Sequence, residues 1–234
     1  MVKSSPLFLV ISEFDWPAFF GNLASICFFI VYVPQFILNY RRKSVDGFSK
    51  SSVILKLVGS AFLCVNSLFN GSQFPIFLYG FLNTIEHSLF LVQFATYGKQ
   101  YYSLIYILIP VFPFLICKFL PFLIPYTDLI KPITQFVGHI PQLIICIKRG
   151  STKGISIIGE HLHYVGSVLG FLMLLMTRNF SISRWILYGN TLLQALSIYI
   201  VASFYGELRL RDYLNAKSSF DHEPLLDNSK PNLL

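Results

Sequence analysis

The residues that could carry chemistry in this chain are ionisable and amide side chains that interrupt long apolar runs. Glu86 and His87 are adjacent near the middle of one such run, just after Asn83. A carboxyl group buried there can exchange protons with an acidic compartment, which is the chemistry that proton coupling needs. The alternative is a structural ion pair of Glu86 with Lys56, which would neutralise both charges without moving anything. Both interpretations stay open from the sequence.

A second group of such residues occurs later in the chain. Glu160 and His163 are three residues apart, so they share one face of a helix, whereas His161 points elsewhere. A Glu-x-x-His pair can also bind a metal ion, but there is no second pair of this kind with partner glutamates, and no metal site is predicted. Asn190 and Gln194 add amide groups to the last apolar run.

The elements that hold these residues are duplicated. Pro34-Gln35 and Pro141-Gln142 each open a similar stretch that ends in a basic turn, and the two copies are 107 residues apart (141 − 34). The same offset relates further residues: Lys56 to His163, Gly59 to Gly166, Asn83 to Asn190 and Ala95 to Ala202. The repeat is therefore a whole unit of about three helices, and a parallel repeat of this kind is typical of transporters.

The composition indicates a membrane protein. Hydrophobic residues make up 54% of the chain and charged residues only 12%, with a mean hydropathy of +0.62; soluble proteins have about a quarter charged residues. The four cysteines fall within apolar runs, so no disulfide framework is predicted. The net charge of +7 comes from short basic clusters beside apolar runs, which indicates membrane topology and excludes nucleic acid as a partner.

The apolar runs predict seven membrane-spanning helices, because a span needs about 20 mostly apolar residues. These runs cover residues 17–40, 51–70, 75–97, 103–124, 129–147, 155–176 and 185–206. The predicted fold class is an all-α membrane protein in which two parallel three-helix bundles are joined by a linker helix. The linker is needed because three helices per repeat would otherwise leave the two repeats in opposite orientations.

Basic residues predict the orientation. Most lysines and arginines fall on one side of the predicted spans, and only Lys3, Arg178 and Arg184 fall on the other, so the N-terminus is expected in the lumen and the C-terminus in the cytosol. The predicted organisation is a lumenal N-terminus (1–16), a first repeat (17–97), a linker helix (98–128), a second repeat (129–206) and a disordered cytosolic tail (207–234). Asn70 and Asn179 begin glycosylation tripeptides in lumenal loops, but such tripeptides arise often by chance and these lie very close to the bilayer, so unmodified loops are favoured.

The doubled Pro-Gln motif with its basic turns resembles the PQ-loop family, which includes cystinosin and the lysosomal cationic amino-acid exporters. The resemblance covers nearly the whole chain and implies transport by alternating access. Pro34 and Pro141 would be hinges, because proline removes a backbone hydrogen bond and kinks a helix. Gln35 and Gln142 could bond the carbonyls that these prolines free. The alternative is a static bend that only improves packing.

The resemblance also implies a path for substrate or protons through the bundle. Its expected lining is Lys56, Asn83, Glu86, His87, Glu160, His163, Asn190 and Gln194. Cystinosin-like proteins have acidic residues at the positions of His163 and Gln194; a histidine can still bind and release a proton, but a glutamine cannot. Lys56 adds a cation that would attract an anionic substrate group or repel cationic amino acids.

The tail contains a candidate sorting signal. The segment from Asp221 to Leu226 has the acidic-x-x-x-Leu-Leu pattern that ends in Leu225-Leu226, and clathrin adaptors read such extended segments as a signal for lysosomes or endosomes. This pattern supports a lysosomal or vacuolar membrane location. It counts against a protein that resides in the endoplasmic reticulum or Golgi.

The leading hypothesis is a transporter that exports an amino acid, of the cystine or cationic type, or a similar small solute. It uses protons as coupling ion and needs no other cofactor, and no enzyme activity is expected. One alternative is a non-transporting PQ-loop factor or a sorting receptor of the endoplasmic reticulum or Golgi. Another is a sugar carrier of the SWEET type, against which the ionisable residues count. The substrate and the oligomeric state do not follow from the sequence.

Overall fold

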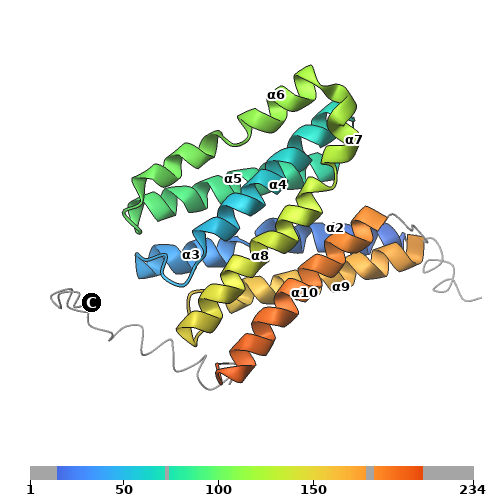
Figure 1. Ribbon diagram of the computed structural model, residues 1–234. Helices are drawn as coiled ribbons and strands as arrows, with labels where there is room; N and C mark the ends of the chain where they lie inside the picture. Colours follow the sequence, from blue (N-terminus) through green and yellow to red (C-terminus); the bar gives the residue numbers. More distant parts are fainter. Residues whose placement is uncertain (1–14, 72–73, 178–181, 208–234) are drawn as a thin grey trace, which may run out of the picture.

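The protein is helical throughout the part that the structure describes. The computed structural model describes residues 15–71, 74–177 and 182–207, and no strand occurs within these ranges. In chain order the elements are α2 (Trp16–Ile30), α3 (Val33–Arg42), α4 (Lys50–Phe69), α5 (Phe74–Thr96), the 3-10 helix η1 (Tyr101–Leu108), α6 (Val111–Phe119), η2 (Pro121–Leu123), α7 (Ile124–Thr127), α8 (Ile130–Arg149), α9 (Ile157–Thr177) and α10 (Ile182–Phe204) (Figure 1). The predicted all-α fold class is confirmed.

Six stretches of the described chain are long and apolar enough to cross a membrane. They are Trp16–Arg42, which joins α2 and α3, Lys50–Phe69, Tyr101–Phe119, Ile130–Arg149, Ile157–Thr177 and Arg184–Phe204. Helix α5 has 23 residues, which is enough to cross the roughly 30 Å hydrocarbon core. It carries the polar residues Asn83, Glu86, His87 and Gln93, and these lower its hydropathy. The seventh span therefore stays a prediction.

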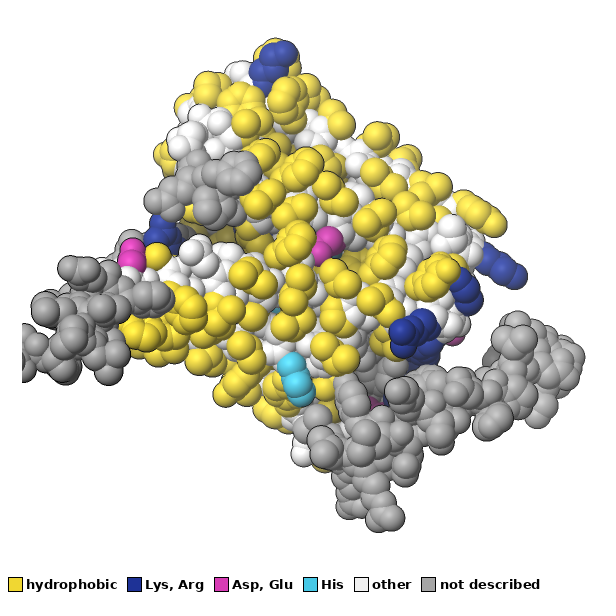
Figure 2. Space-filling view, turned by 180° about the vertical axis from the view of Figure 1, so that it is seen from behind, with side chains coloured by type: hydrophobic (Ala, Val, Ile, Leu, Met, Phe, Trp, Pro, Cys, Tyr) yellow, Lys and Arg dark blue, Asp and Glu magenta, His cyan; other side chains and the backbone are white. Residues whose placement is uncertain are grey.

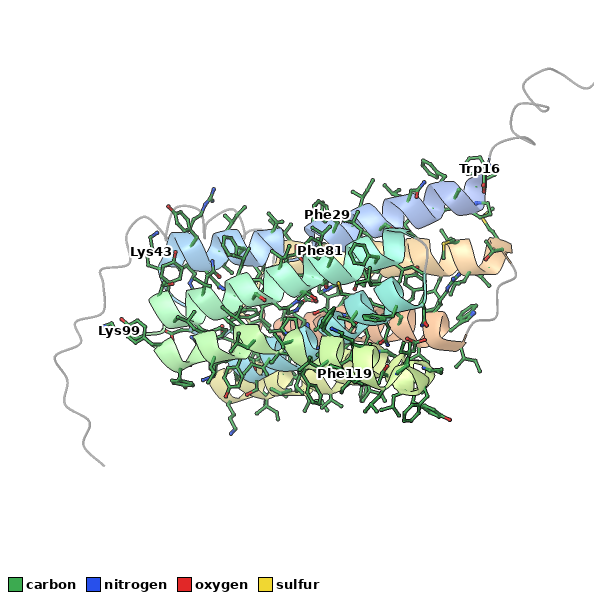
Figure 3. The ribbon with its side chains drawn as sticks, turned by 90° about the horizontal axis from the view of Figure 1, so that it is seen from above. Trp16, Phe29, Lys43, Phe81, Lys99 and Phe119 are labelled. Atoms are coloured by element: carbon green, nitrogen blue, oxygen red, sulfur yellow. The ribbon has the colours of Figure 1, made fainter. Side chains whose placement is uncertain are left out.

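The surface fits a protein that lies across a membrane. Figure 2 shows a face that is covered mostly by hydrophobic side chains, with lysines and arginines towards its edges. Lys43 and Lys99 lie at one end of the helices and Trp16 lies at the other (Figure 3). We call the end with Lys43 and Lys99 the loop end. Which compartment each end faces stays a prediction.

The two repeats interlock. Helix α2 of the first half packs along α9, the middle helix of the second half, and α8 of the second half packs along α4, the middle helix of the first (Figure 1). The middle and last helices of each half pack on each other, α4 on α5 and α9 on α10. Each half therefore contributes its first helix to the other half, and the interface between the halves runs through the centre of the protein.

Glycines at equivalent positions let these helix pairs approach closely. A Cβ added to Gly59 in α4 would lie 2.1 Å from Thr134 Oγ1 in α8. A Cβ added to Gly166 in α9 would lie 3.1 Å from Cys27 Cβ in α2. Because Gly59 and Gly166 are related by the repeat offset, the contacts of α4 with α8 and of α9 with α2 both depend on a glycine at the same position of the repeat. A larger side chain at either position would require its neighbours in the other half to move.

The linker between the repeats is broken by its prolines. Pro110 lies between η1 and α6, and Pro121 begins η2. The eight residues of η1 form an unusually long 3-10 helix, since such helices rarely exceed three or four residues. η1 packs on α5, and α6 packs on α4. The linker thus covers the outside of the first half.

Candidate functional site

The two Pro-Gln motifs shape their helices differently. Helix α2 ends at Ile30 and α3 begins at Val33, so the first helix is broken just before Pro34. Helix α8 runs without a break from Ile130 to Arg149, with Pro141 inside it. The first motif thus lies at a break and the second lies inside a continuous helix, and the hinge role of Pro34 and Pro141 stays a prediction. A proline removes one backbone hydrogen bond, and a long helix packed along its length can lose that bond without breaking.

Gln35 binds the loop of the opposite half. We call residues 43–49 loop 1 and residues 150–156 loop 2. The Nε2 of Gln35 donates a hydrogen bond of 3.1 Å to the carbonyl oxygen of Gly154 in loop 2, and its Oε1 accepts one of 2.7 Å from the N–H of Ser156. Both groups of the amide are therefore used to hold loop 2.

Gln142 makes the equivalent contacts with loop 1. Its Nε2 donates a hydrogen bond of 2.8 Å to the carbonyl oxygen of Gly47, and its Oε1 accepts one of 2.8 Å from the N–H of Ser49. The expectation that Gln35 and Gln142 would bond carbonyls freed in their own helices is therefore wrong. Both side chains cross the interface and fix the loop of the other repeat.

The two loops meet at their glycines. A Cβ added to Gly154 would lie 2.5 Å from the Cα of Gly47 and 2.8 Å from the carbonyl oxygen of Asp46. Gly47 has a φ of +83°, a conformation that favours glycine. Arg42 adds a hydrogen bond of 3.0 Å from Nη1 to the carbonyl oxygen of Lys153. Backbone contact therefore closes the loop end of the interface.

A small cavity of about 40 Å³ adjoins this contact and is lined by both glutamines of the motifs. Its charged or titratable lining consists of Lys56 in α4, His139 in α8, Glu160 and His163 in α9, and Tyr32 between α2 and α3. A cavity of this size holds about three water molecules. It is too small for an amino acid in this conformation.

Within the cavity, Glu160 and His163 form a pair. The Oε2 of Glu160 lies 3.4 Å from the Nδ1 of His163, and this is an ion pair when the histidine is protonated. The Nε2 of His139 lies 2.6 Å from the Oγ of Ser197. The sequence therefore predicted the one-face arrangement of Glu160 and His163 correctly, while their function stays a prediction.

Lys56 lines the same cavity. Its Nζ lies 5.7 Å from the centre of the Tyr32 ring. Glu86 does not lie within ion-pair distance of Lys56: in the described ranges, the pair of Glu160 and His163 is the contact that qualifies. The alternative of a structural ion pair between Glu86 and Lys56 is therefore wrong.

Glu86 and His87 lie outside the cavity lining. The Nδ1 of His87 is 2.6 Å from the carbonyl oxygen of Asn83; because a carbonyl only accepts, Nδ1 carries hydrogen, and the buried Nε2 has no partner. The Oε2 of Glu86 is also buried without a hydrogen-bond partner. It borders an apolar pocket of about 140 Å³ with Val33 and Phe36, beside the break between α2 and α3.

Asn190 and Gln194 brace α10 against α8. The Nδ2 of Asn190 donates to the carbonyl oxygen of Pro132 at 2.9 Å, and the Nε2 of Gln194 donates to that of Gln135 at 3.1 Å. Neither residue lines the cavity. Of the eight residues expected along a path, the structure brings Lys56, Glu160 and His163 together at the cavity, and the other five are not part of its lining.

Sequence reasoning missed a polar face of α8. Lys131, Gln135 and His139 are spaced by four residues and lie on one side of the helix, and all three are buried. The Nζ of Lys131 is 5.6 Å from the centre of the Tyr79 ring, and the Oε1 of Gln135 is buried without a partner. The four-residue spacing is the signal that could have identified this face.

Glu207 belongs to the folded protein, although the sequence places it in the disordered tail. It accepts hydrogen bonds from the Oγ of Ser151 at 2.5 Å and from the N–H of Thr152 at 2.7 Å, and thus anchors loop 2. Burial raises the pKa of the carboxyl group, but the hydrogen bonds from Ser151 and Thr152 outweigh burial and hold the pKa below its ordinary value.

The remaining predicted sites fall wholly or partly outside the described residues. Asp221, Leu225, Leu226 and Asn179 lie outside them. Asn70 is exposed where α4 ends, but Ser72 of its tripeptide is not described. Sorting and glycosylation therefore stay predictions. In the described ranges, no three His, Cys, Asp or Glu side chains are grouped so that they could hold a metal ion.

Comparison with known proteins agrees with the resemblance read from the motifs. Residues 16–76 match the family model described as PQ loop repeat, so the predicted resemblance is confirmed over the first part of the chain. A similar protein is the vacuolar histidine transporter of Saccharomyces cerevisiae, which is 26% identical over 85 residues. The match covers 36% of this chain, and the chain spans 29% of the length of that relative.

Proposed function

We propose that this chain, which carries a PQ-loop repeat, is a transporter that moves an amino acid across a vacuolar or lysosomal membrane with protons as the coupling ion. The observation that carries the proposal is the cavity between the interlocked halves. It contains charged and titratable groups, and the two loops close it at one end. Separation of the loops would open the cavity towards the cytosol, and movement at the other end would open it towards the lumen.

The strength of the loop contacts suits a gate. Gln35 and Gln142 together make four hydrogen bonds to the opposite loops. Each contributes about 1 kcal/mol net, so the four stabilise the closed state by about 4 kcal/mol. To move a two-state equilibrium from 1:99 to 99:1, a ligand must bind the favoured state more tightly by about 5.5 kcal/mol. Substrate and protons can therefore open such a gate.

The nature of the cavity supports an amino acid as substrate. A lysine and a glutamate are costly inside a membrane, and they are usually retained for a function. A sugar has no charged group to match Lys56 and Glu160. The yeast relative is named as a histidine transporter, so histidine is the first substrate to test, followed by lysine and cystine.

Transport by purified protein in liposomes tests the proposal. We expect uptake of radiolabelled histidine, lysine or cystine when the external medium is acidic, and loss of this uptake when a protonophore removes the pH gradient. Protein-free liposomes give the background rate. If well-folded protein moves no amino acid under any pH gradient, the proposal is wrong. Uptake of glucose that is independent of the pH gradient would instead support the sugar-carrier alternative.

The proposed location has its own test in cells. A tagged protein is expected in vacuolar or lysosomal membranes, and replacement of both Leu225 and Leu226 by alanine is expected to divert it to the cell surface. If the wild-type protein resides in the endoplasmic reticulum or Golgi, the non-transporting factor or sorting receptor becomes the better interpretation.

A further inference from the structure

We infer that Lys56 and Glu160 form a subsite for the zwitterionic backbone of an α-amino acid, in which Lys56 binds the α-carboxylate and Glu160 binds the α-ammonium group. The inference rests on the proposed transport function and assigns the groups that recognise its substrate. The two residues belong to different halves of the protein and line the same cavity.

The position of the two residues supports the subsite. Lys56 lies in α4 and Glu160 lies in α9, the middle helices of the first and second halves. Both line the cavity between the halves. A ligand bound to both would therefore link the two halves, and its binding would depend on how far the halves are separated.

Both residues have unused bonding capacity. In the described part of the chain, no hydrogen bond or ion pair engages the Nζ of Lys56, and the Tyr32 ring lies 5.7 Å away. Glu160 uses only its Oε2, in a long contact of 3.4 Å with His163. An ammonium group offers three donors, and a carboxylate offers about four acceptor positions. Both side chains can therefore accept a ligand without losing an established partner.

The balance of charge favours a zwitterion. Lys56 and Glu160 together carry no net charge, and a zwitterion adds none to the buried site. A simple amine would leave Lys56 without a partner, and a simple carboxylic acid would leave Glu160 with only its long contact to His163. Removal of one partner from a buried pair of charges weakens binding by about 30-fold or more. The site should therefore select ligands that carry both groups.

Binding measurements with purified full-length protein test the subsite. The ligands are histidine, histamine, which lacks the carboxylate, and imidazolepropionate, which lacks the amine. Lysine, cadaverine and 6-aminohexanoate form a second set. The wild-type protein is expected to bind each amino acid about 30-fold or more tightly than either of its analogues. His161→Gln, a change on an exposed part of α9, is the control and should behave like the wild type.

The two neutral variants should change selectivity in opposite directions. Lys56→Gln is expected to abolish the preference for the amino acid over the amine while keeping its preference over the acid. Glu160→Gln is expected to do the reverse. Equal weakening of all three ligands in either variant, or unchanged selectivity in both, overturns the subsite. If the wild-type protein neither binds nor transports any amino acid, the proposed function itself fails.

A charge-swapped protein covers the case in which a neutral variant does not fold. The double variant with Lys56→Glu and Glu160→Lys keeps one charge of each sign in the cavity, so a zwitterion can bind in the reversed orientation. It is expected to prefer the amino acid over both analogues. A preference for the amine or for the acid in this variant overturns the subsite.

Discussion

Glu86 combines features that set it apart from the charged groups of the cavity. Its Oε2 is buried without a hydrogen-bond partner, and its surroundings beside Val33 and Phe36 are apolar. A carboxylate oxygen without a hydrogen bond is costly in such a place, so gain or loss of its proton should change how α5 packs on the break between α2 and α3. Glu86 can thus connect protonation to movement of the first helix.

Replacement of Glu86 by glutamine tests this connection. The amide keeps the shape of the side chain but cannot exchange a proton, so Glu86→Gln is expected to lose the stimulation of uptake by a pH gradient while keeping amino-acid exchange at equal pH. Asp15→Asn is the matched control, because asparagine caps a helix as well as aspartate does. Full stimulation of the Glu86→Gln protein would contradict the role.

The site residues differ in how far the sequence could predict them. The spacing of Glu160 and His163 was sufficient to place both on one helix face, because that relation is local. The partners of Gln35 were not predictable, since Gly154 is 119 residues away in the chain. No local pattern states which loop an amide will reach. The repeat offset makes Gln35 and Gln142 equivalent, but it does not show that each binds the other half.

Among the elements, the two loops depend on the absence of a side chain at Gly154. An added Cβ there would lie 2.5 Å from the backbone of Gly47, so Gly154→Ala is expected to destabilise the closed loop end by about 1–3 kcal/mol. The measurement uses a protein without its native cysteines and with a cysteine in place of Ser52, which lines the cavity. In the Gly154→Ala protein this cysteine should react with a small thiol reagent at least about fivefold faster than when Gly154 is kept.

A helical glycine provides the control for this change. A Cβ added to Gly189 would meet only Phe171, at an ordinary distance of 3.9 Å, so Gly189→Ala should leave the labelling rate unchanged. Unaltered labelling in the Gly154→Ala protein would show that the glycine contact does not close the cavity.

Loop 2 should also respond to pH through Glu207. Hydrogen bonds from Ser151 and Thr152 hold the pKa of this carboxyl below its ordinary value. Such a group stabilises the folded loop at pH values above the unfolded pKa, and the contribution is lost as pH falls through the lower folded pKa. Loop 2 should therefore stay protected from hydrogen exchange at pH 5 and lose protection only at lower pH.

The Glu207→Gln variant completes this test. A neutral amide makes weaker hydrogen bonds than a carboxylate, so loop 2 should exchange faster in the variant than in the wild type at neutral pH, with no further change as the pH falls towards 4. Loss of protection in the wild type between pH 7 and pH 5 would contradict the assignment to Glu207.

Helix positions were predictable where hydropathy alone decides them. The span predicted at 129–147 is helix α8 (Ile130–Arg149), and the one at 155–176 is α9 (Ile157–Thr177). The span predicted at 103–124 contains several elements, because Pro110 and Pro121 interrupt it. Whether a proline breaks a helix depends on its packing, and Pro34 and Pro141 show both outcomes from one motif.

For the whole molecule, the exchange of first helices between the halves was not predictable. The repeat offset identifies equivalent helices, but apolar faces do not show which helix each one packs on. In the structure α2 lies along α9, and α8 lies along α4. The equivalent close contacts at Gly59 and Gly166 both join one half to the other. A half by itself would therefore leave uncovered the helix surfaces that pack on the other half.

This arrangement predicts that neither half is stable by itself. Residues 1–97 produced alone should aggregate or be degraded, because α4 would lack α8 and α2 would lack α9. Co-expression of 1–97 with 98–234 as separate chains should restore a complex that co-purifies, since the cut at residue 97 precedes the linker and leaves every crossing intact.

Gly59→Leu in the first piece should prevent assembly, because Thr134 Oγ1 would lie 2.1 Å from the new Cβ. Gly189→Ala in the second piece is the control, since a Cβ there would meet only Phe171, at an ordinary distance of 3.9 Å. A stable, monodisperse first piece would show instead that each repeat folds as an independent bundle.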